Sequence, residues 1–327
     1  MRVFRNILIT VLCIAAVGAS AVFGYCRIRG AREKELLEAG LSLMDRGNYR
    51  EAREKFVEAQ ALENRITRRM SEDSLEEDLF KYAAICDFHL GDLDEAAEIY
   101  DRMLRIHPSD PSLMESRAVV YAAQGQVEEA VALFDEAIVI DRRNYTRVYH
   151  AALTLREYAG PEAGNKYLEI LVEQYGDEAD PVTRGQALCF LERYEEAVQL
   201  LGEIQNPDMQ TSFLYASAVE HTGGHEKALS ILAEYEEQLP SNPDMLALKG
   251  TALCGLARYE EAIECFDRAL PLAGEGTELR RSILFNRIAA YENLCRYDRA
   301  KELAAEYAQE YPDDPRMQRE NLFLQTR

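Results

Sequence analysis

The stretch PSLMESRAVVYAAQGQVEEAVALFDEAIVIDRRN, residues 111–144, decides the fold, because most of the remaining chain repeats its pattern. In its first half, Met114, Ala118 and Tyr121 recur at three- and four-residue spacing, which places them on one face of a helix. Gly125 predicts the end of that helix. A second helix is predicted by a second apolar stripe, formed by Val127, Ala130, Val131, Phe134 and Ala137. A pair of helices this short cannot bury its own stripes, so the pattern predicts copies stacked on either side.

Copies of this two-helix unit occur along nearly the whole chain. Each copy is marked by a small residue near the start of its second helix: Ala52, Ala96, Ala130, Gly164, Ala197, Ala228, Ala262 and Ala300. Three of the intervals between successive markers are 34 residues, and the others range from 31 to 44. This recurrence predicts an all-α solenoid of about eight helix-turn-helix repeats, an architecture that grows without splitting into separate domains.

Other residues recur in phase with the marker. An aromatic or aliphatic residue lies three positions before it in six copies: Tyr49, Leu93, Val127, Tyr194, Tyr259 and Tyr297. A proline lies twelve positions after it in three copies: Pro108, Pro240 and Pro312. With the 34-residue period, these residues resemble the tetratricopeptide repeat family over about Glu33 to Asp314. The predicted solenoid, residues 33–314, then contains repeats near 33–66, 77–110, 111–144, 145–178, 178–208, 209–242, 243–276 and 281–314.

The resemblance implies a right-handed superhelix whose first helices line a concave groove that holds a peptide or protein segment. It also implies a scaffold or adaptor, because members of that family are rarely enzymes. Two places depart from the family pattern: one copy carries Gly160, Pro161 and Gly164 around its turn, and the next ends early at Asn206-Pro207. We do not expect regular curvature at these two places.

The N-terminal segment, residues 1–32, predicts a signal anchor. Residues 7–25 carry no charge and approach the length that spans a bilayer as a helix. A cleaved signal peptide is the first alternative, because Ala19-Ser20-Ala21 resembles a cleavage site, and lipid modification at Cys26 is the second. We expect an uncleaved transmembrane helix, because the apolar run continues through Phe23 and basic residues follow it.

The same segment predicts a single-pass protein of the cell membrane, attached through residues 7–25. The short basic tail before the segment favours repeats on the extracytoplasmic side. Basic residues just after it favour the opposite orientation: Arg27, Arg29, Arg32 and Lys34. The cysteines favour that opposite orientation too, because their odd number and scattered spacing predict no complete disulfide framework. They are Cys86, Cys189, Cys254, Cys265 and Cys295.

The C-terminal residues, 315–327, predict a capping helix. Asp313-Asp314-Pro315 indicates a helix start, since proline is tolerated in the first turn. The exposed end of the last repeat needs a cover, and four apolar residues are available for it: Met317, Leu322, Phe323 and Leu324.

The charge of the chain restricts its partners. The formal net charge is −21, and residues 1–32 hold five arginines and no acid, so the rest carries 32 basic against 58 acidic side chains, a net charge of −26. Such a surface repels phosphate backbones, which argues against nucleic-acid binding. Much of the acidity is explained locally, because adjacent acids lie where second helices begin and meet the positive end of the helix dipole: Asp94-Glu95, Glu128-Glu129, Glu195-Glu196 and Glu260-Glu261. Attraction of a basic partner is the other explanation.

Catalytic and metal-binding patterns are weak. His221 and His225 have the spacing of two metal ligands on one helix, but Gly223-Gly224 between them predicts a turn. A metal-dependent hydrolase that uses these two histidines is therefore an alternative, as is a structural oligomer built through the solenoid ends. There is no Gly-rich phosphate loop and no nucleophile elbow. We expect no enzyme, no cofactor and no metal.

The groove remains as the candidate site. First-helix side chains that point away from the second helix should line it: Lys81, Ile85, Glu115, Val119, Tyr149, Leu153, Gln186, Phe213 and Ser217. Some members of the resembled family grip a C-terminal carboxylate with basic residues at such positions, and here only Lys81 fits that role. We therefore expect a protein or peptide segment of neutral or positive charge, which docks through apolar side chains. Tyr149 and Phe213 could instead pack between neighbouring repeats.

Overall fold

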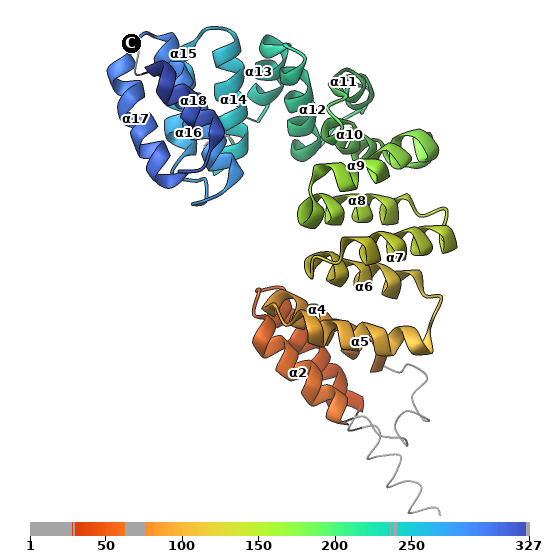
Figure 1. The fold of residues 1–327 in the computed structure, drawn as a ribbon. Coiled ribbons are helices and arrows are strands. Elements are labelled where there is room, and N and C mark those ends of the chain that lie inside the picture. The colour runs from red at the N-terminus through yellow and green to blue at the C-terminus, as the bar shows by residue number, and fades with distance from the viewer. Residues whose placement is uncertain (1–27, 29, 63–75, 236, 238–240, 325–327) are drawn as a thin grey trace, which may run out of the picture. The chain divides into compact units, whose positions relative to one another are not determined.

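A computed structural model of the protein describes residues 28, 30–62, 76–235, 237 and 241–324. Every regular element in this described part is helical, which confirms the predicted all-α fold (Figure 1). The chain divides into two compact units, which meet in sequence between Tyr167 and Leu168. We describe each unit by itself, and the repeat boundaries within them remain a prediction.

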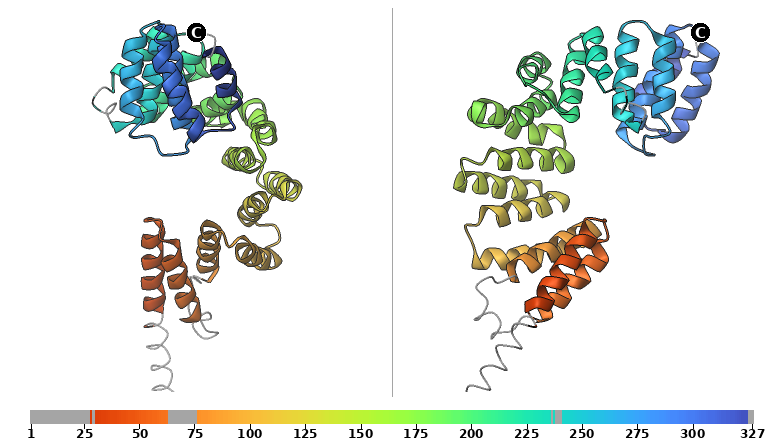
Figure 2. Two further views of the ribbon diagram at one scale, coloured as in Figure 1. Left: turned by 60° about the vertical axis from the view of Figure 1, so that its left-hand side comes forward. Right: turned by 180° about the vertical axis from the view of Figure 1, so that it is seen from behind.

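In the first unit, residues 30–44 are helical, and successive helices after them pack beside one another (Figure 2). Their bounds are α2 (Tyr49–Leu62), α4 (Glu76–Leu90), α5 (Leu93–Ile106), α6 (Pro111–Ala123), α7 (Val127–Ile140), α8 (Tyr145–Ala159) and α9 (Pro161–Ile170), whose last three residues belong to the second unit. The deciding stretch thus forms α6 and α7, as its two apolar stripes predict.

In the second unit, a π-helical turn (Leu171–Tyr175) and a 3₁₀ turn (Gly176–Glu178) follow the end of α9. Its α-helices are α10 (Pro181–Phe190), α11 (Tyr194–Gly202), α12 (Met209–His221), α13 (His225–Ala233), α14 (Pro243–Gly255), α15 (Tyr259–Ala269), α16 (Glu278–Asn293), α17 (Tyr297–Glu310) and α18 (Pro315–Leu324). The irregular turns fall in the copy whose glycines and proline depart from the family pattern.

The tight turn inside the repeat needs a residue in the left-handed region, which lies five positions before the marker in seven of the eight copies. In the degenerate copy, Gly160 takes this role four positions before the marker. In the deciding stretch, Gly125 has φ +76° and ends α6 as predicted. Gly47, Gly91 and Gly223 have the same conformation, which glycine adopts without steric cost. Three copies place a residue with a Cβ at this position, with φ between 55° and 59°: Glu192, Ala257 and Cys295. The turn geometry therefore persists without glycine, at a cost in backbone strain.

An acidic, amide or hydroxyl side chain caps five of the described first helices: α6, α10, α12, α14 and α16. Asp110 accepts hydrogen bonds from the backbone N–H groups of Ser112 and Leu113, at 2.8 and 3.2 Å. Asp180 caps α10 in the same way, and both caps precede a proline at the first helical position. The second helices α5, α7, α11 and α15 have no such side-chain cap. Each carries one of the four predicted acidic pairs in its first turn.

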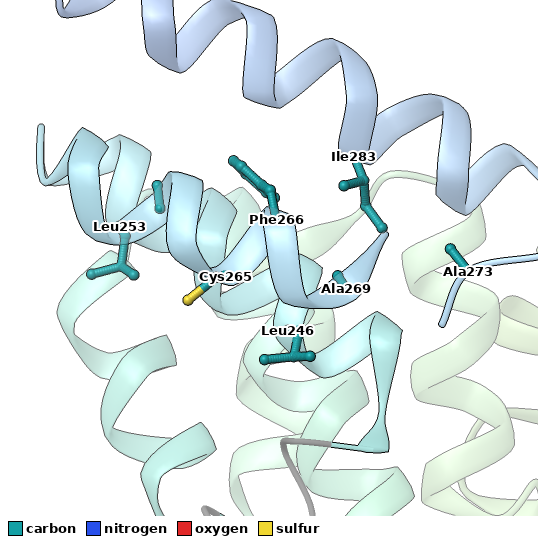
Figure 3. Packing of buried hydrophobic residues seen from close by; sticks show 8 residues of the cluster. Leu246, Leu253, Cys265, Phe266, Ala269, Ala273 and Ile283 are labelled. Atoms are coloured by element: carbon teal, nitrogen blue, oxygen red, sulfur yellow. The ribbon is translucent and has the colours of Figure 1, made fainter. Parts of the chain in front are cut away.

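The core of each repeat depends on a complementary pair of side-chain sizes. Twelve positions before the marker lies a small residue, and four positions after it a large one, both buried; examples are Ala118 with Phe134 and Gly250 with Phe266. A Cβ atom added to Gly250 would lie only 2.5 Å from Phe266 Cε1, so the ring occupies that space. Figure 3 shows Phe266 within the cluster it forms with Leu246, Leu253, Ala262, Cys265, Ala269, Ala273 and Ile283.

The last repeat reverses this size relation. Ile288 occupies the position of the small residue and Ala304 that of the large one, and both are buried in one cluster. This pair thus still combines a small and a large side chain, but the large one lies on the first helix of the repeat instead of the second.

The degenerate copy needs its glycine. A Cβ at Gly164 would collide with the backbone carbonyl oxygen of Ala152 and with Cγ of Arg156. Helices α8 and α9 therefore approach more closely than an alanine marker would allow.

The C-terminal helix α18 covers part of the last repeat. Asp314 caps it by accepting from the backbone N–H of Arg316 at 2.8 Å, and the Tyr307 hydroxyl donates to the same carboxylate. Met317 and Leu324 are buried against α16 and α17. Phe323 is 39% exposed, and its part in covering the repeat remains a prediction.

The predicted localisation, a single-pass protein of the cell membrane with extracytoplasmic repeats, is wrong. Within the ranges that the structure describes, no helix is both long and apolar enough to cross a bilayer. The predicted anchor, residues 7–25, lies outside the described residues. The polar segment Arg65–Ser74 before α4 lies outside them too.

Candidate peptide-binding groove

The nine predicted groove residues all lie on first helices, and each is partly exposed. They are Lys81 and Ile85 on α4, Glu115 and Val119 on α6, Tyr149 and Leu153 on α8, Gln186 on α10, and Phe213 and Ser217 on α12. The first six belong to the first unit and the last three to the second. A binding surface formed by these residues remains a prediction, and the two units contribute separate parts of it.

An apolar cavity of about 230 Å³ lies between α4 and α6 and brings two predicted residues together. Ile85 and Val119 form part of its walls, one from each first helix. The other lining residues are Phe88, His89, Tyr100, Ser116 and Val120. We call this feature the α4–α6 cavity; its size and apolar walls suit one bulky side chain of a bound segment.

Few polar groups line the α4–α6 cavity. Tyr100 reaches it from α5 and is almost fully buried, which raises the pKa of its hydroxyl to about 12, so the hydroxyl stays neutral. The Ser116 hydroxyl donates to the backbone carbonyl of Ser112 at 3.0 Å, within its own helix. The His89 ring stacks on Tyr49 of the preceding repeat, with ring centroids 4.2 Å apart. The cavity thus lacks a carboxylate or a permanent cation and favours an apolar group.

Glu115 proves to be paired rather than open to a ligand. One carboxylate oxygen accepts from His150 Nδ1 at 2.8 Å, and the other pairs with Arg147, both on α8. Arg147 is 5% exposed and also donates to the Pro111 carbonyl at 2.7 Å. The network joins α6 to α8 and fixes their spacing. The sequence pattern missed this, since 32 to 35 residues separate the partners.

His150 makes this network sensitive to pH. The hydrogen bond to Glu115 raises the pKa of its imidazole above the ordinary value of about 6.5. The contact between His150 and Glu115 therefore stabilises the fold fully below the pKa that His150 has in the unfolded chain. This stabilisation is lost as the pH rises through the pKa that His150 has in the folded protein. We expect an NMR titration of His150 to give a raised pKa in the wild type and a lower one in Glu115→Gln. An unchanged His150 pKa in that variant would contradict the assignment.

The remaining predicted residues have mixed surroundings. Phe213 packs at the edge of a buried cluster that contains Ala216, Leu232 and Met245, so it also serves the contact between repeats. Leu153 and Tyr149 are partly exposed on α8, and Tyr149 has an interaction partner of its own. Gln186 and Ser217 are partly exposed on α10 and α12, and Lys81 forms no ion pair with a described residue.

The two histidines of the metal alternative have different structural roles. His221 ends α12 and stacks on Tyr194, with centroids 4.2 Å apart and planes 5° from parallel. His225 begins α13, where its ring fills the space above Gly255 and its Nδ1 lies 3.4 Å from Glu220. In the described parts of the chain, no three or more His, Cys, Asp or Glu side chains are placed to hold a metal ion. The histidines thus pack between consecutive repeats.

Sequence reasoning missed several residues of the α4–α6 cavity. Phe88, His89 and Tyr100 lie on core-facing or helix-end positions, and their access to a shared cavity depends on the spacing between α4 and α6. The stacking of His89 on Tyr49 has a sequence signal in retrospect. Tyr49 lies three positions before the marker of its own copy, and His89 lies seven positions before the marker of the next copy. Tyr194 and His221 have the same spacing and also stack.

The known proteins that resemble this chain include an assembly protein and a tetratricopeptide repeat protein of known structure. The photosystem I assembly protein Ycf3 of Cyanophora paradoxa is 34% identical over 106 residues, which cover 30% of this chain and 57% of that protein. The match thus spans little more than half of the relative's length. A crystal structure of a tetratricopeptide repeat protein from Parabacteroides merdae has a TM-score of 0.52 and 16% identity, and the alignment covers 78% of this chain and 99% of that chain. At this identity the likeness concerns the fold alone.

The tetratricopeptide repeat model matches the sequence directly. The matches cover residues 37–111, 88–145 and 248–315, which together make up more than half of the 327 residues. They fall in both units and include the deciding stretch. This agreement confirms the resemblance predicted from the phased small residues: the chain belongs to the tetratricopeptide repeat family.

Proposed function

We propose that this protein is a non-enzymatic adaptor or scaffold that binds a segment of a protein partner along α4, α6 and α8. The observation that carries the proposal is the α4–α6 cavity, whose apolar walls include Ile85 and Val119. A bulky apolar side chain of the segment fills this cavity, and a second one contacts the α8 surface near Tyr149 and Leu153. The backbone of the segment is extended or helical.

Charge supports a neutral or basic segment. The chain beyond residue 32 has a net charge of −26, so an acidic segment meets repulsion throughout its approach. The local contribution of Glu115 is small, because His150 and Arg147 occupy both of its carboxylate oxygens. Selectivity for charge therefore arises mainly from distant acids and affects the association rate, while the buried apolar contacts set the dissociation rate.

Similarity to an assembly protein supports this class of function. Ycf3 is described as an assembly protein, which fits a scaffold that holds other polypeptides. The matched region is 57% of that protein, so its particular assembly task is not assigned to this chain. The proposed role is the general one of presenting or holding a protein segment.

Two peptide libraries test the proposal on the full chain. Both carry two bulky apolar residues per peptide, and they differ only in having basic or acidic flanking residues. We expect the basic library to bind and the acidic one to fail, with association slowed by salt. Val119→Lys should weaken binding of the selected peptides by about tenfold or more, the loss typical of a buried anchor site.

The matched control is Val139→Lys on α7, where the valine is 56% exposed and lies outside the α4–α6 cavity. It adds the same charge to the same unit and should leave binding unchanged. Equal losses of peptide affinity in Val119→Lys and Val139→Lys would show that only the added charge weakens binding. That result would refute the α4–α6 cavity as the anchor site. Selection of chiefly acidic peptides would refute the proposed partner.

A further inference from the structure

A polar cavity of about 480 Å³ lies between α2 and α5 in the first unit. It shares no lining residue with the α4–α6 cavity. Its lining consists of Arg53 from α2, Asp87 from α4, and six residues of α5: Glu95, Glu98, Ile99, Asp101, Arg102 and Arg105. We propose that this α2–α5 cavity is a second binding site, which takes a guanidinium or alkylammonium group.

Asp87 is the residue that points to a ligand. Its side chain has no exposed surface, and Oδ1 accepts from Nε of Arg53. The other oxygen, Oδ2, is buried and has no hydrogen-bond partner. A buried acceptor without a donor is unfavourable, and a donor from a ligand would remove this penalty. Burial raises the pKa of this carboxyl although Arg53 favours its charged form, so the charge is incompletely compensated.

The arginines of the cavity leave room for another cation. Arg53 is committed to Asp87, and the guanidinium of Arg102 lies over the ring of Phe80, 4.2 Å from its centroid. Arg105 forms no ion pair with a described residue and lies on the last turn of α5, away from Glu95 along the helix. Arg102 and Arg105 thus keep charges that form no ion pair with a carboxylate of the described residues.

The acids that line the cavity outnumber its arginines by four to three. Asp101 is paired with Arg117 of α6 at 2.7 Å, but Glu95 and Glu98 form no ion pair with a described residue. These two exposed carboxylates lie three residues apart on α5, so their side chains are neighbours on one face. With Oδ2 of Asp87, they provide three acceptor groups that favour a cationic donor.

The arrangement suits an organic cation better than a metal ion. Across the described ranges, no three acidic, histidine or cysteine side chains are placed to surround one ion. A guanidinium offers five donors in a planar fork, and an ammonium on a flexible stem offers three, so either reaches separate acceptors. Ile99 provides an apolar wall for the carbon stem. The source is an arginine or lysine side chain of a protein partner, or a free polyamine.

NMR of the isotope-labelled full chain tests this site with two probes, the peptide acetyl-Gly-Arg-Gly-amide and spermidine. We expect saturable shifts of amide signals in α4 and α5 at low salt. Tighter binding of the peptide identifies a partner's side chain as the source, and tighter binding of spermidine identifies a free polyamine. Absence of saturable binding by both probes would overturn the proposal.

Three variants locate the bound cation. The double change Glu95→Gln/Glu98→Gln should weaken binding about fivefold or more, since it removes both exposed carboxylates that pair with the bound cation. Asp87→Asn should also weaken it, and the surface double variant keeps the test valid if Asp87→Asn fails to fold. Glu128→Gln/Glu129→Gln on α7 is the matched control, with equal charge removed from another exposed first turn.

The control should bind the probes as the wild type does. An equal loss in the control and in Glu95→Gln/Glu98→Gln would show general attraction to an acidic surface and overturn the site. Unchanged binding in Glu95→Gln/Glu98→Gln would overturn it as well. The apolar peptide libraries that test the α4–α6 cavity report separately, because the two cavities share no lining residue.

Discussion

Replacing Phe266 with alanine should lower the free energy of unfolding by about 3–5 kcal/mol, the range for removing a fully buried ring from a close-packed core. Phe266 has no exposed surface, and its ring fills the space beside Gly250 where a Cβ atom would otherwise lie. Helices α14 and α15 cannot close fully over the cavity left by the ring, because the other buried residues of the cluster hold the two helices apart. Urea unfolding, followed by circular dichroism, measures the loss.

A second substitution should recover part of that loss. Gly250→Ile alone should cost about 1–3 kcal/mol through overpacking against Phe266. In Gly250→Ile/Phe266→Ala the large side chain moves to the other helix, as Ile288 and Ala304 are arranged in the last repeat. We therefore expect the double variant to be at least about 1 kcal/mol more stable than additivity predicts.

The control for this coupling combines Gly250→Ile with Phe134→Ala, which lies in the other unit. Those two effects should add within about 0.5 kcal/mol, as is usual for separated sites. Strict additivity in the Gly250–Phe266 pair as well would show that the two positions do not share one packing space.

Gly164→Ala should cost about 3 kcal/mol, the upper end of overpacking effects. The added Cβ meets the carbonyl oxygen of Ala152, which belongs to the backbone of α8 and cannot rotate away. Separating α8 from α9 would relieve the collision, but Tyr167 and Leu168 on α9 are fully buried and would lose contacts. Thermal unfolding checks this result.

Gly30→Ala is the matched control for Gly164→Ala. Gly30 is also helical, but nothing lies within 4 Å of the position its Cβ would take. Alanine has the higher helix propensity, so this variant should be neutral or stabilised by up to about 1 kcal/mol. If Gly164→Ala were equally neutral, the close approach of α8 and α9 would be disproved.

The fold could be predicted from the sequence because its determinants are local and repeated. The spacing of Ala130, Phe134 and Ala137 specifies one buried face within a single helix, and all three are fully buried. Gly125 ends α6 by its own conformational preference. Repetition then multiplies a weak local signal, since a chance pattern would not keep its phase through copy after copy.

The candidate site could be predicted only in part. The first-helix positions of Ile85 and Val119 follow from helical periodicity, and these residues line the α4–α6 cavity. Whether they share a cavity depends on the spacing of α4 and α6, which many contacts determine together. Glu115 was expected to face a ligand, but Arg147 and His150 of α8 bind its carboxylate. A partly buried charge is stable only when it is paired, and the partners lie on another helix.

By itself, the sequence determined the helices, their order and the stripes by which they pack, since these depend on residues three to seven positions apart. The tertiary structure alone decided which side chains from different helices meet. Asp87 and Arg53 lie 34 residues apart, and the unpaired oxygen of Asp87 arises only from their contact. The same holds for the π-helical turn at Leu171–Tyr175, because competition between local helix geometry and distant packing has no periodic signal in the chain.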